Sequence, residues 1–344
     1  MQAPMVFKGS PGSPYTRKMM ALMRYRHIPY RYLVGEAADR AGMPKPPVKL
    51  LPTFYLPDAQ GQLQAVTDST PLLRRLDRDV AGRAARPANA VLAFIDSLLE
   101  DFADEWLTKA MFHYRWKFAP DIDRASKTIP LHWAGLQMDE PVYAASKAFF
   151  SKRQIDRLPV IGSNPTTAPV IEAGYVRLLG LLDAHFSKHV FLMGARPGAS
   201  DFALYGQLSQ LALFDPTSMG LAVQHAPRAF AWTGWVEDLS GWEVQGDAWL
   251  DAAHLPVSLL ALLAELAQGY VPVMLANARA LSRGEKQFSA ELPQGLWEQG
   301  TVTYQGKCLR WLREEFAALD TAQQAQADAI LQTAGISELI HAPL

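Results

Sequence analysis

The sequence predicts an α/β domain, then an all-helical domain, then a mostly helical extension. Over residues 1–82, short patterns typical of strands alternate with helical patterns. Over residues 83–240, long segments with apolar residues at helical spacing dominate. Over residues 241–344 the helical pattern is weaker and two short stretches favour strands. We therefore expect three parts with these boundaries.

The first part has the predicted order β-α-β-α-β-β-α, with only a weak signal for the second helix. Strands are expected at 5–8, 30–34, 53–56 and 63–67, where strand-forming residues lie between turn residues. A helix is expected over 14–27, and another begins after the Thr-Asp-Ser stretch at 67–69. A strand-helix-strand start favours a right-handed crossover and parallel pairing of the first two strands.

The second part is predicted to consist of helices joined by linkers rich in Pro, Gly or Ser. The expected helices are 88–117, 140–157, 168–187, 199–213 and 227–239. Gly198 is expected at the N-cap of the fourth helix. Asp201, three residues further on, can reach back to free N–H groups there.

The extension is predicted to pack on the body of the protein. Its Trp297, Trp311 and Leu312 indicate burial rather than disorder. The expected elements are a helix over 257–281 kinked at Pro272, short strands at 287–292 and 301–304, and helices over 307–319 and 321–333.

Composition sets broad limits on function. Lys and Arg total 33 against 34 for Asp and Glu, so we expect no nucleic acid partner. Cys308 is the only cysteine, which excludes an intrachain disulfide and a cysteine-based metal site, and fits a reducing compartment. No signal peptide pattern is found. The apolar stretch 255–266 is interrupted and too short to span a bilayer, so no membrane association is expected.

The most informative stretch is Ser13-Pro14, which follows a short strand and a Gly-rich turn and begins a helix. A hydroxyl there lies beside unpaired N–H groups and the positive end of the helix dipole. Such a position can stabilise an anion, including a bound thiolate. The alternative is that Ser13 is only the helix N-cap, and the two roles can coexist. Ser10, Tyr15 and Thr16 are further hydroxyls that could contact the sulfur.

Four motifs together resemble a cytosolic-type glutathione S-transferase of the serine type over about the first 215 residues. Ser-Pro-Tyr at 13–15 resembles its catalytic loop, and Leu-Leu-Pro-Thr at 50–53 resembles its cis-proline segment. Thr-Asp-Ser at 67–69 resembles its ligand-binding Glu/Gln-Ser pair, with Asp in place of Glu or Gln. Residues 194–206 resemble the helix-cap motif of its second domain, with Gly198 replacing the usual Ser or Thr. The extension has no counterpart in ordinary members.

This resemblance implies a thioredoxin-like first domain that binds glutathione as co-substrate. Leu51, before a cis Pro52, would pair with the cysteinyl backbone of glutathione. Asp68 would accept hydrogen bonds from its ammonium, and Ser69 would hold its α-carboxylate at a helix N-terminus. Lys49 would reach the glycyl carboxylate. The alternatives are an ordinary trans proline, a plain helix cap and a solvated lysine.

The electrophile site is expected between the two domains. Tyr15 is one candidate for its wall, and Phe112, His113 and Trp116 at the end of the first long helix are others. An aromatic cluster at helical spacing is also typical of a helix–helix core. His113 has no partner at metal-ligand spacing nearby, so no metal is expected.

We therefore interpret the chain as a glutathione-dependent transferase in which Ser13 activates the thiolate for attack on an apolar electrophile. The resemblance further implies a cytoplasmic homodimer. Because no cysteine is near Ser13, a mixed disulfide with the enzyme is not expected. The alternatives are a non-catalytic glutathione-binding or sensor protein and a scaffold that retains the fold; Asp68 and the extension favour them.

Overall fold

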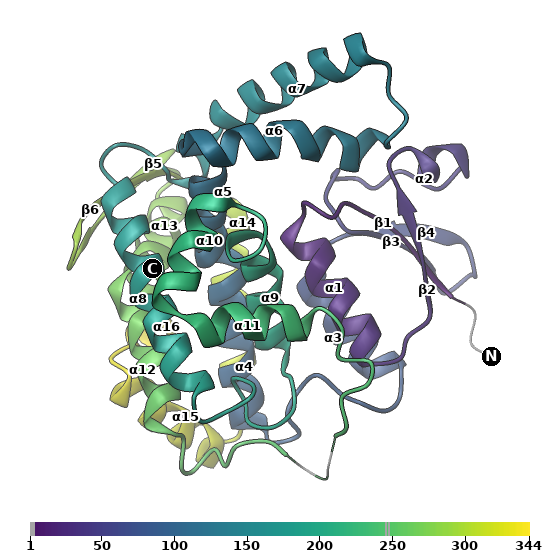
Figure 1. Ribbon diagram of the computed structural model, residues 1–344. Coiled ribbons are helices and arrows are strands. Elements are labelled where there is room, and N and C mark those ends of the chain that lie inside the picture. The colour runs from purple at the N-terminus through teal and green to yellow at the C-terminus, as the bar shows by residue number, and fades with distance from the viewer. Residues whose placement is uncertain (1–3, 245, 247) are drawn as a thin grey trace.

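The computed structural model describes residues 4–244, 246 and 248–344. Residues 1–3 of the expected first domain and residues 245 and 247 of the expected extension therefore lie outside the described residues. A small sheet with its helices forms one side of the molecule, and a larger helical body forms the other (Figure 1). The extension continues from the body and lies against it.

The sheet has four strands in the order β2-β1-β3-β4. They are β1 (Met5–Gly9), β2 (Tyr30–Val34), β3 (Thr53–Pro57) and β4 (Leu63–Val66). β1 and β2 are parallel, whereas β3 is antiparallel to both β1 and β4. All four predicted strands and the parallel start are confirmed, and the arrangement is thioredoxin-like.

Three helices complete this part: α1 (Pro14–Tyr25), α2 (Ala37–Arg40) and α3 (Ser69–Asp79). Helix α1 ends two residues earlier than predicted, and His27 then adopts a positive φ of 55°. The face of α1 that carries Met19 and Leu22 is fully buried. Apolar periodicity thus places α1 between the sheet and the helical body.

The body is built around two long helical stretches that pack on α1. The predicted helix over 88–117 is in fact α4 (Ala90–Phe102), a π-helical turn η1 (Ala103–Leu107) and α5 (Thr108–Lys117). α9 (Ala199–Leu211) packs against both α1 and α4. α8 (Ala168–Phe186) packs against α5. The sequence pattern does not reveal the π-turn, because apolar spacing continues through it.

The body also contains helices that the sequence pattern misses. α6 (Ala119–Ala134) carries Pro130 inside it, and with α7 (Glu140–Ile155) forms a hairpin that projects from the body (Figure 1). α10 (Pro216–His225) was also missed, whereas α11 (Pro227–Val236) was expected. A short 3-10 turn, η2 (Leu158–Ile161), follows α7.

The start of α9 explains why glycine stands at position 198. Asp201 reaches back to the Gly198 N–H at 2.8 Å, as predicted. The missing cap side chain is replaced by Asp96 of α4, whose carboxylate accepts from the N–H groups of Ala199 and Ser200, both at 3.0 Å. A Cβ at Gly198 would lie 2.4 Å from Asp96 Oδ1, so a larger residue would displace that carboxylate.

The extension departs from the prediction at two places. Its first helix is broken into α12 (Val257–Glu265), a 3-10 turn η3 (Leu266–Gln268) and α13 (Tyr270–Ser282). The break lies before Tyr270, and Pro272 falls in the first turn of α13, where its missing N–H costs nothing, so the predicted kink there is wrong. The predicted strand at 301–304 is also wrong, because Thr303 begins a helix.

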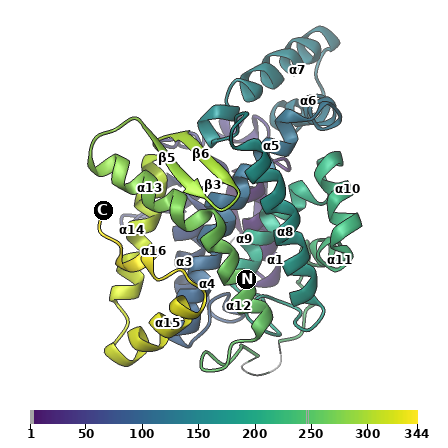
Figure 2. The same ribbon diagram turned by 90° about the vertical axis from the view of Figure 1, so that its left-hand side faces the viewer.

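The remaining elements of the extension are a hairpin and three helices. β5 (Gln287–Leu292) pairs antiparallel with β6 (Gly295–Gly300). α14 (Thr303–Ala317), α15 (Thr321–Thr333) and the short α16 (Glu338–His341) follow. α14 and α15 both pack against α4, and the view in Figure 2 shows these helices beside it.

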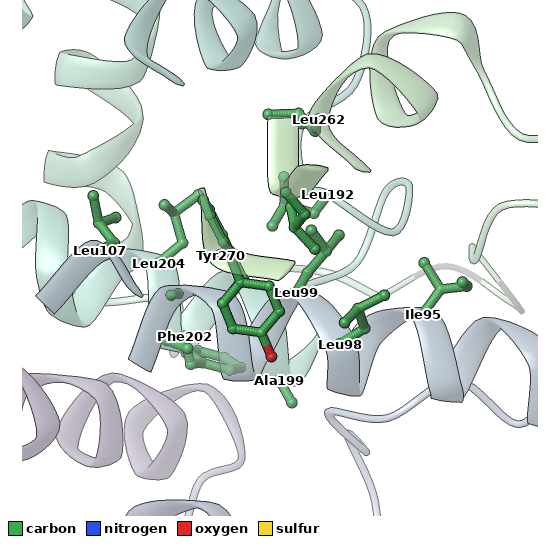
Figure 3. Packing of buried hydrophobic residues seen from close by; sticks show 14 of the residues in the cluster. Ile95, Leu98, Leu99, Leu107, Leu192, Ala199, Phe202, Leu204, Leu262 and Tyr270 are labelled. Carbon is green, nitrogen blue, oxygen red and sulfur yellow. The ribbon is translucent and has the colours of Figure 1, made fainter. Parts of the chain in front are cut away.

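One continuous apolar core joins the body and the extension. Figure 3 shows Tyr270 of α13 directed towards α4, with Leu262 of α12 in the same apolar cluster. Both are buried, together with Leu99 and Phe202. The extension is therefore packed on the body by the same kind of contact that holds the body together.

The helical stretch Val257–Ser282 is longer than the apolar segment expected from the sequence. It has 26 residues and its most apolar window has a mean hydropathy of 1.7, enough in length and composition to cross a membrane. The expectation of too short a segment is thus corrected. In this fold 56% of that window is buried. Buried core helices meet the same criterion, so the stretch by itself assigns no membrane role.

Gly206 permits the close approach of α9 to α1. A Cβ at Gly206 would lie 2.6 Å from the Pro14 carbonyl oxygen, which belongs to the backbone of α1. We expect Gly206→Ala to lower the free energy of unfolding by about 1–3 kcal/mol, because the two helices must separate. Gly220→Ala on α10 is the control, since nothing lies within 4 Å of its Cβ. Urea unfolding of both variants measures the difference; equal effects would contradict this account.

Candidate functional site

A cavity of about 800 Å³ lies where the thioredoxin-like domain, the π-turn and the extension meet. The first domain contributes Tyr15, Leu51, Asp68 and Ser69 to its wall. Helix α4 and η1 contribute three carboxylic acids, and α14 contributes Tyr304, Lys307, Cys308 and Trp311. Its size falls within the range of pockets that hold small ligands.

Asp68 and Ser69 reach the cavity at the N-terminus of α3. Asp68 has a positive φ of 85°, which L-residues rarely adopt, and its side chain makes no cap hydrogen bond. Asp68 thus occupies the N-cap position of α3 without capping it through its side chain. Its carboxylate instead accepts a hydrogen bond from the Tyr304 hydroxyl at 2.8 Å. Strained backbone of this kind gathers at ligand sites.

Leu51 lies at the edge of the cavity, and the Leu51–Pro52 peptide bond is cis, as the resemblance implied. Among the described residues, neither backbone group of Leu51 has a hydrogen-bond partner. These free groups are available to an extended ligand. Lys49, two residues earlier, is exposed and does not line the cavity.

The hydroxyl groups at the start of α1 have different surroundings. Ser13 is half-buried and is the N-cap of α1, because its Oγ accepts from the Thr16 N–H at 3.3 Å. Ser13 is not among the residues that line the cavity. Ser10 and Thr16 are buried, and the Thr16 hydroxyl accepts from the Ser10 N–H at 3.3 Å. Neither of the latter two is available to a ligand.

Tyr15 lines the cavity but its hydroxyl is already engaged. It donates to the Asp104 carbonyl oxygen at 2.8 Å and lies 3.4 Å from Thr108 Oγ1. Burial, with the nearby carboxylate of Glu105, raises the pKa of Tyr15 well above its usual value. Tyr15 is thus a neutral wall residue that links α1 to the π-turn.

The deep side of the cavity is lined by Asp101, Asp104 and Glu105. Burial, supported by the neighbouring carboxylates, raises the pKa of Asp101 to about 7 and that of Glu105 to about 8. Burial also raises the pKa of Asp104 to about 6, although Lys18 opposes this shift. Cys308 of α14 lies beside these acids, and burial raises the pKa of its thiol, so it is a protonated wall residue.

Lys18 compensates the negative charge of Glu100 and Asp104 on the side of these acids that faces α1. Its ammonium lies 2.6 Å from Asp104 Oδ2 and 2.7 Å from Glu100 Oε1, with its side chain fully buried. The cations Lys18 and Arg74 hold the pKa of Glu100 down at about 2 although burial opposes this. Asp104 Oδ1 remains buried without a partner in the described part of the chain. The ion pairs fix α1 to α4 and η1.

Sequence reasoning missed the contribution of α14. Tyr304, Lys307 and Trp311 of the extension all line the cavity, as Leu51 and Asp68 do. The spacing 304, 307 and 311 places them on one helix face, which is a signal of a shared surface but not of its partner. The hydrogen-bond partner of Tyr304 is Asp68, which lies 236 residues earlier in the chain.

The aromatic residues at the end of α5 lie away from the cavity. Trp116 is buried against Ala125 and Ile129 of α6, and Phe112 packs against the same cluster. His113 is fully buried, with Ser163 Oγ at 2.7 Å from Nδ1 and Glu172 Oε1 at 3.1 Å from Nε2. Burial lowers the pKa of His113 to about 4. These residues form the helix–helix core that the sequence analysis gave as the alternative.

The fold and this cavity define a class of protein: a thioredoxin-like domain joined to a helical body, with a cavity where the two meet. Residues 8–84 match the family model "Glutathione S-transferase, N-terminal domain". The first domain therefore matches the N-terminal domain of glutathione S-transferases, in agreement with the resemblance seen in this part of the sequence.

Solved structures with a similar fold include a GST-like protein from Pseudomonas syringae. It is 13% identical, with 68% of this chain and 67% of that chain covered and a TM-score of 0.43. A glutathione transferase family member from Pseudomonas fluorescens Pf-5, with two glutathione molecules bound, is 16% identical, with coverages of 68% and 89% and a TM-score of 0.42. A glutathione S-transferase from Rhodospirillum rubrum F11 is 15% identical, with coverages of 75% and 91% and a TM-score of 0.40. No curated protein gives a significant match.

Removing the buried cation Lys18 should lower the free energy of unfolding far more than removing an exposed lysine. We expect Lys18→Met to lower the free energy of unfolding by ~3–5 kcal/mol, because Glu100 and Asp104 then lack a compensating charge. Lys127→Met is the control, since Lys127 forms an exposed ion pair with Asp123 and should change stability by less than ~1 kcal/mol. Denaturant unfolding measures both, and a small effect of Lys18→Met would show that the pairs are dispensable.

Glu105 should make stability depend on pH. Its pKa in the folded protein is about 8, above the usual value near 4.5, so the folded state holds a proton that the unfolded state releases. Stability contributed by this proton is present below the unfolded pKa and is lost as pH rises towards 8. We expect the free energy of unfolding of Glu105→Gln to fall less than that of wild type between about pH 5 and pH 8. Denaturant unfolding at each pH measures this difference. Glu298→Gln on exposed β6 is the control, and parallel curves for wild type and Glu105→Gln would contradict the assignment.

Proposed function

We propose that the protein binds glutathione in this cavity and is a glutathione-dependent transferase. The observation that supports this most is the convergence of Leu51, Asp68 and Ser69 on one cavity in a glutathione S-transferase N-terminal domain. The free backbone groups of Leu51 suit the cysteinyl backbone, and the Asp68 carboxylate suits an ammonium group. Ser69 lies at the N-terminus of α3, where free N–H groups suit a carboxylate.

In the proposed reaction Ser13 lowers the pKa of the glutathione thiol. The N-cap contact uses an acceptor lone pair of Ser13 Oγ, so its O–H group can still donate to a sulfur. A hydrogen bond to the thiolate and the positive end of α1 both favour the ionised form. The thiol proton is released to solvent, and the thiolate then attacks the electrophilic carbon, as in an aryl halide, so that a C–S bond forms, the carbon–halogen bond breaks and halide leaves. Val48, Leu50 and Trp311 supply apolar wall for that electrophile.

The second candidate is a glutathione-binding protein without turnover. Two observations favour it: Ser13 does not line the cavity, and carboxyl groups do. Each of these groups that is ionised opposes thiolate formation at a nearby sulfur. The homodimer and the cytoplasmic location implied by the resemblance remain part of the proposal.

Calorimetric titration and a conjugation assay with an aryl halide test these functions together. We expect glutathione to bind, and Ser69→Ala to weaken binding about tenfold, because a hydrogen bond to a charged group is lost. Ser289→Ala on exposed β5 should bind as wild type. We expect Ser13→Ala to reduce kcat/KM about 10–100-fold, whereas Ser13→Thr retains the hydroxyl and most activity.

The outcomes separate the candidates. The absorbance of the glutathione thiolate, measured at a series of pH values, gives the pKa of the bound thiol. This pKa should be higher in Ser13→Ala than in wild type if Ser13 stabilises the thiolate. Binding without turnover in the wild-type protein would leave only the binding function. An absence of binding at millimolar glutathione would refute both candidates.

A further inference from the structure

The helix α14 of the extension does not fill the cavity but builds one of its walls. Tyr304, Lys307 and Trp311 line the cavity together with Leu51, Asp68 and Ser69, and the Tyr304 hydroxyl lies 2.8 Å from Asp68 Oδ2. The cavity has a volume of about 800 Å³. That space is within the range that small ligands occupy. The side chains of α14 are therefore in contact distance of whatever the first domain binds.

Helix α14 is held in this position by charged contacts with α3 and with the segment that follows it. Glu315 lies 2.5 Å from Arg86 and 3.5 Å from Arg74, which belongs to α3. Arg74 also contacts the buried Glu100 at 2.9 Å. The wall formed by α14 is thus fixed relative to Asp68 and Ser69, which begin α3.

Lys307 is the cation of the cavity. In the part of the chain that the structure describes, it is the only lysine or arginine in the cavity wall. Its ammonium lies 4.1 Å from the centre of the Trp311 ring, 5.5 Å from that of Tyr304, and 3.9 Å from Asp68 Oδ2. Cation–π contacts with two aromatic rings and an ion pair with one carboxylate stabilise an ammonium group at this position. The ammonium is thereby kept beside the N-terminus of α3.

The Asp68 carboxylate can still accept hydrogen bonds from a ligand. The Tyr304 hydroxyl donates to Oδ2, and within the described residues no hydrogen bond is made to Oδ1. A carboxylate offers about four acceptor sites in total, so one donor leaves most of them free. Tyr304 therefore orients Asp68 and leaves Oδ1 for an incoming ammonium group.

These contacts place a negative group and a positive group side by side. We propose that Lys307 and Asp68 together bind the zwitterionic α-amino acid end of the ligand, which in glutathione is the γ-glutamyl end. The ammonium lies on Asp68, and the α-carboxylate lies between Lys307 and the N-terminus of α3 at Ser69. Tyr304 is a positioning residue for Asp68. This inference rests on the proposed glutathione binding and makes the extension part of the ligand site.

The test compares glutathione with 4-aminobutanoyl-cysteinyl-glycine, which lacks only the α-carboxylate. Calorimetry on the full chain should show that Lys307→Met weakens glutathione binding about tenfold, as loss of a charged hydrogen bond does. The same substitution should leave binding of the analogue unchanged, and Lys307→Arg should retain most of the glutathione affinity. Arg310→Met is the control, because Arg310 lies on the same helix, pairs with Glu314 and does not line the cavity.

Three results would overturn the assignment. Equal glutathione affinity of Lys307→Met and wild type would show that Lys307 does not touch the ligand. Equal losses for glutathione and the analogue would show that the effect is structural. Tighter binding by Lys307→Met would show that α14 competes with the ligand. If wild type binds neither compound, the proposed function itself fails, and this inference fails with it.

Discussion

The cluster formed by Lys18, Glu100 and Asp104 is the interaction on which the arrangement of the site depends. It joins α1 of the thioredoxin-like domain to α4 and η1 of the body through contacts of 2.6 and 2.7 Å between fully buried groups. Because a buried charge is costly without its partners, this cluster permits few relative positions of the two parts. The position of the cavity between them follows from that constraint.

The π-turn and the extension build on this junction. The π-turn η1 directs Asp104 towards Lys18 and Glu105 towards the cavity, within a helix that would otherwise be continuous. π-turns of this kind are frequent at functional sites. Helix α14 then closes the open side, anchored by Glu315 to Arg74 and Arg86. In this way α14 of the extension adds a wall to a cavity that begins in the thioredoxin-like domain.

Local features of the site could be predicted from the sequence, and long-range ones could not. The strands, α1, α3 and the cap by Asp201 follow from spacing and residue type within a few positions. The resemblance added the cis peptide bond before Pro52, which is observed. The contact of Tyr304 with Asp68 joins residues 236 positions apart, and no local pattern specifies it. The sequence does not distinguish a pocket from a core for Phe112, His113 and Trp116, because an aromatic helix face is suited to both. The structure has these residues in the helix–helix core.

The central claim is that one cavity, formed by both ends of the chain, holds glutathione. The most direct measurement is a crystal structure of the protein with glutathione bound. The account predicts the cysteinyl backbone beside Leu51, the ammonium on Asp68 and the α-carboxylate between Ser69 and Lys307. Glutathione bound elsewhere, or α14 displaced from the cavity by the ligand, would contradict it.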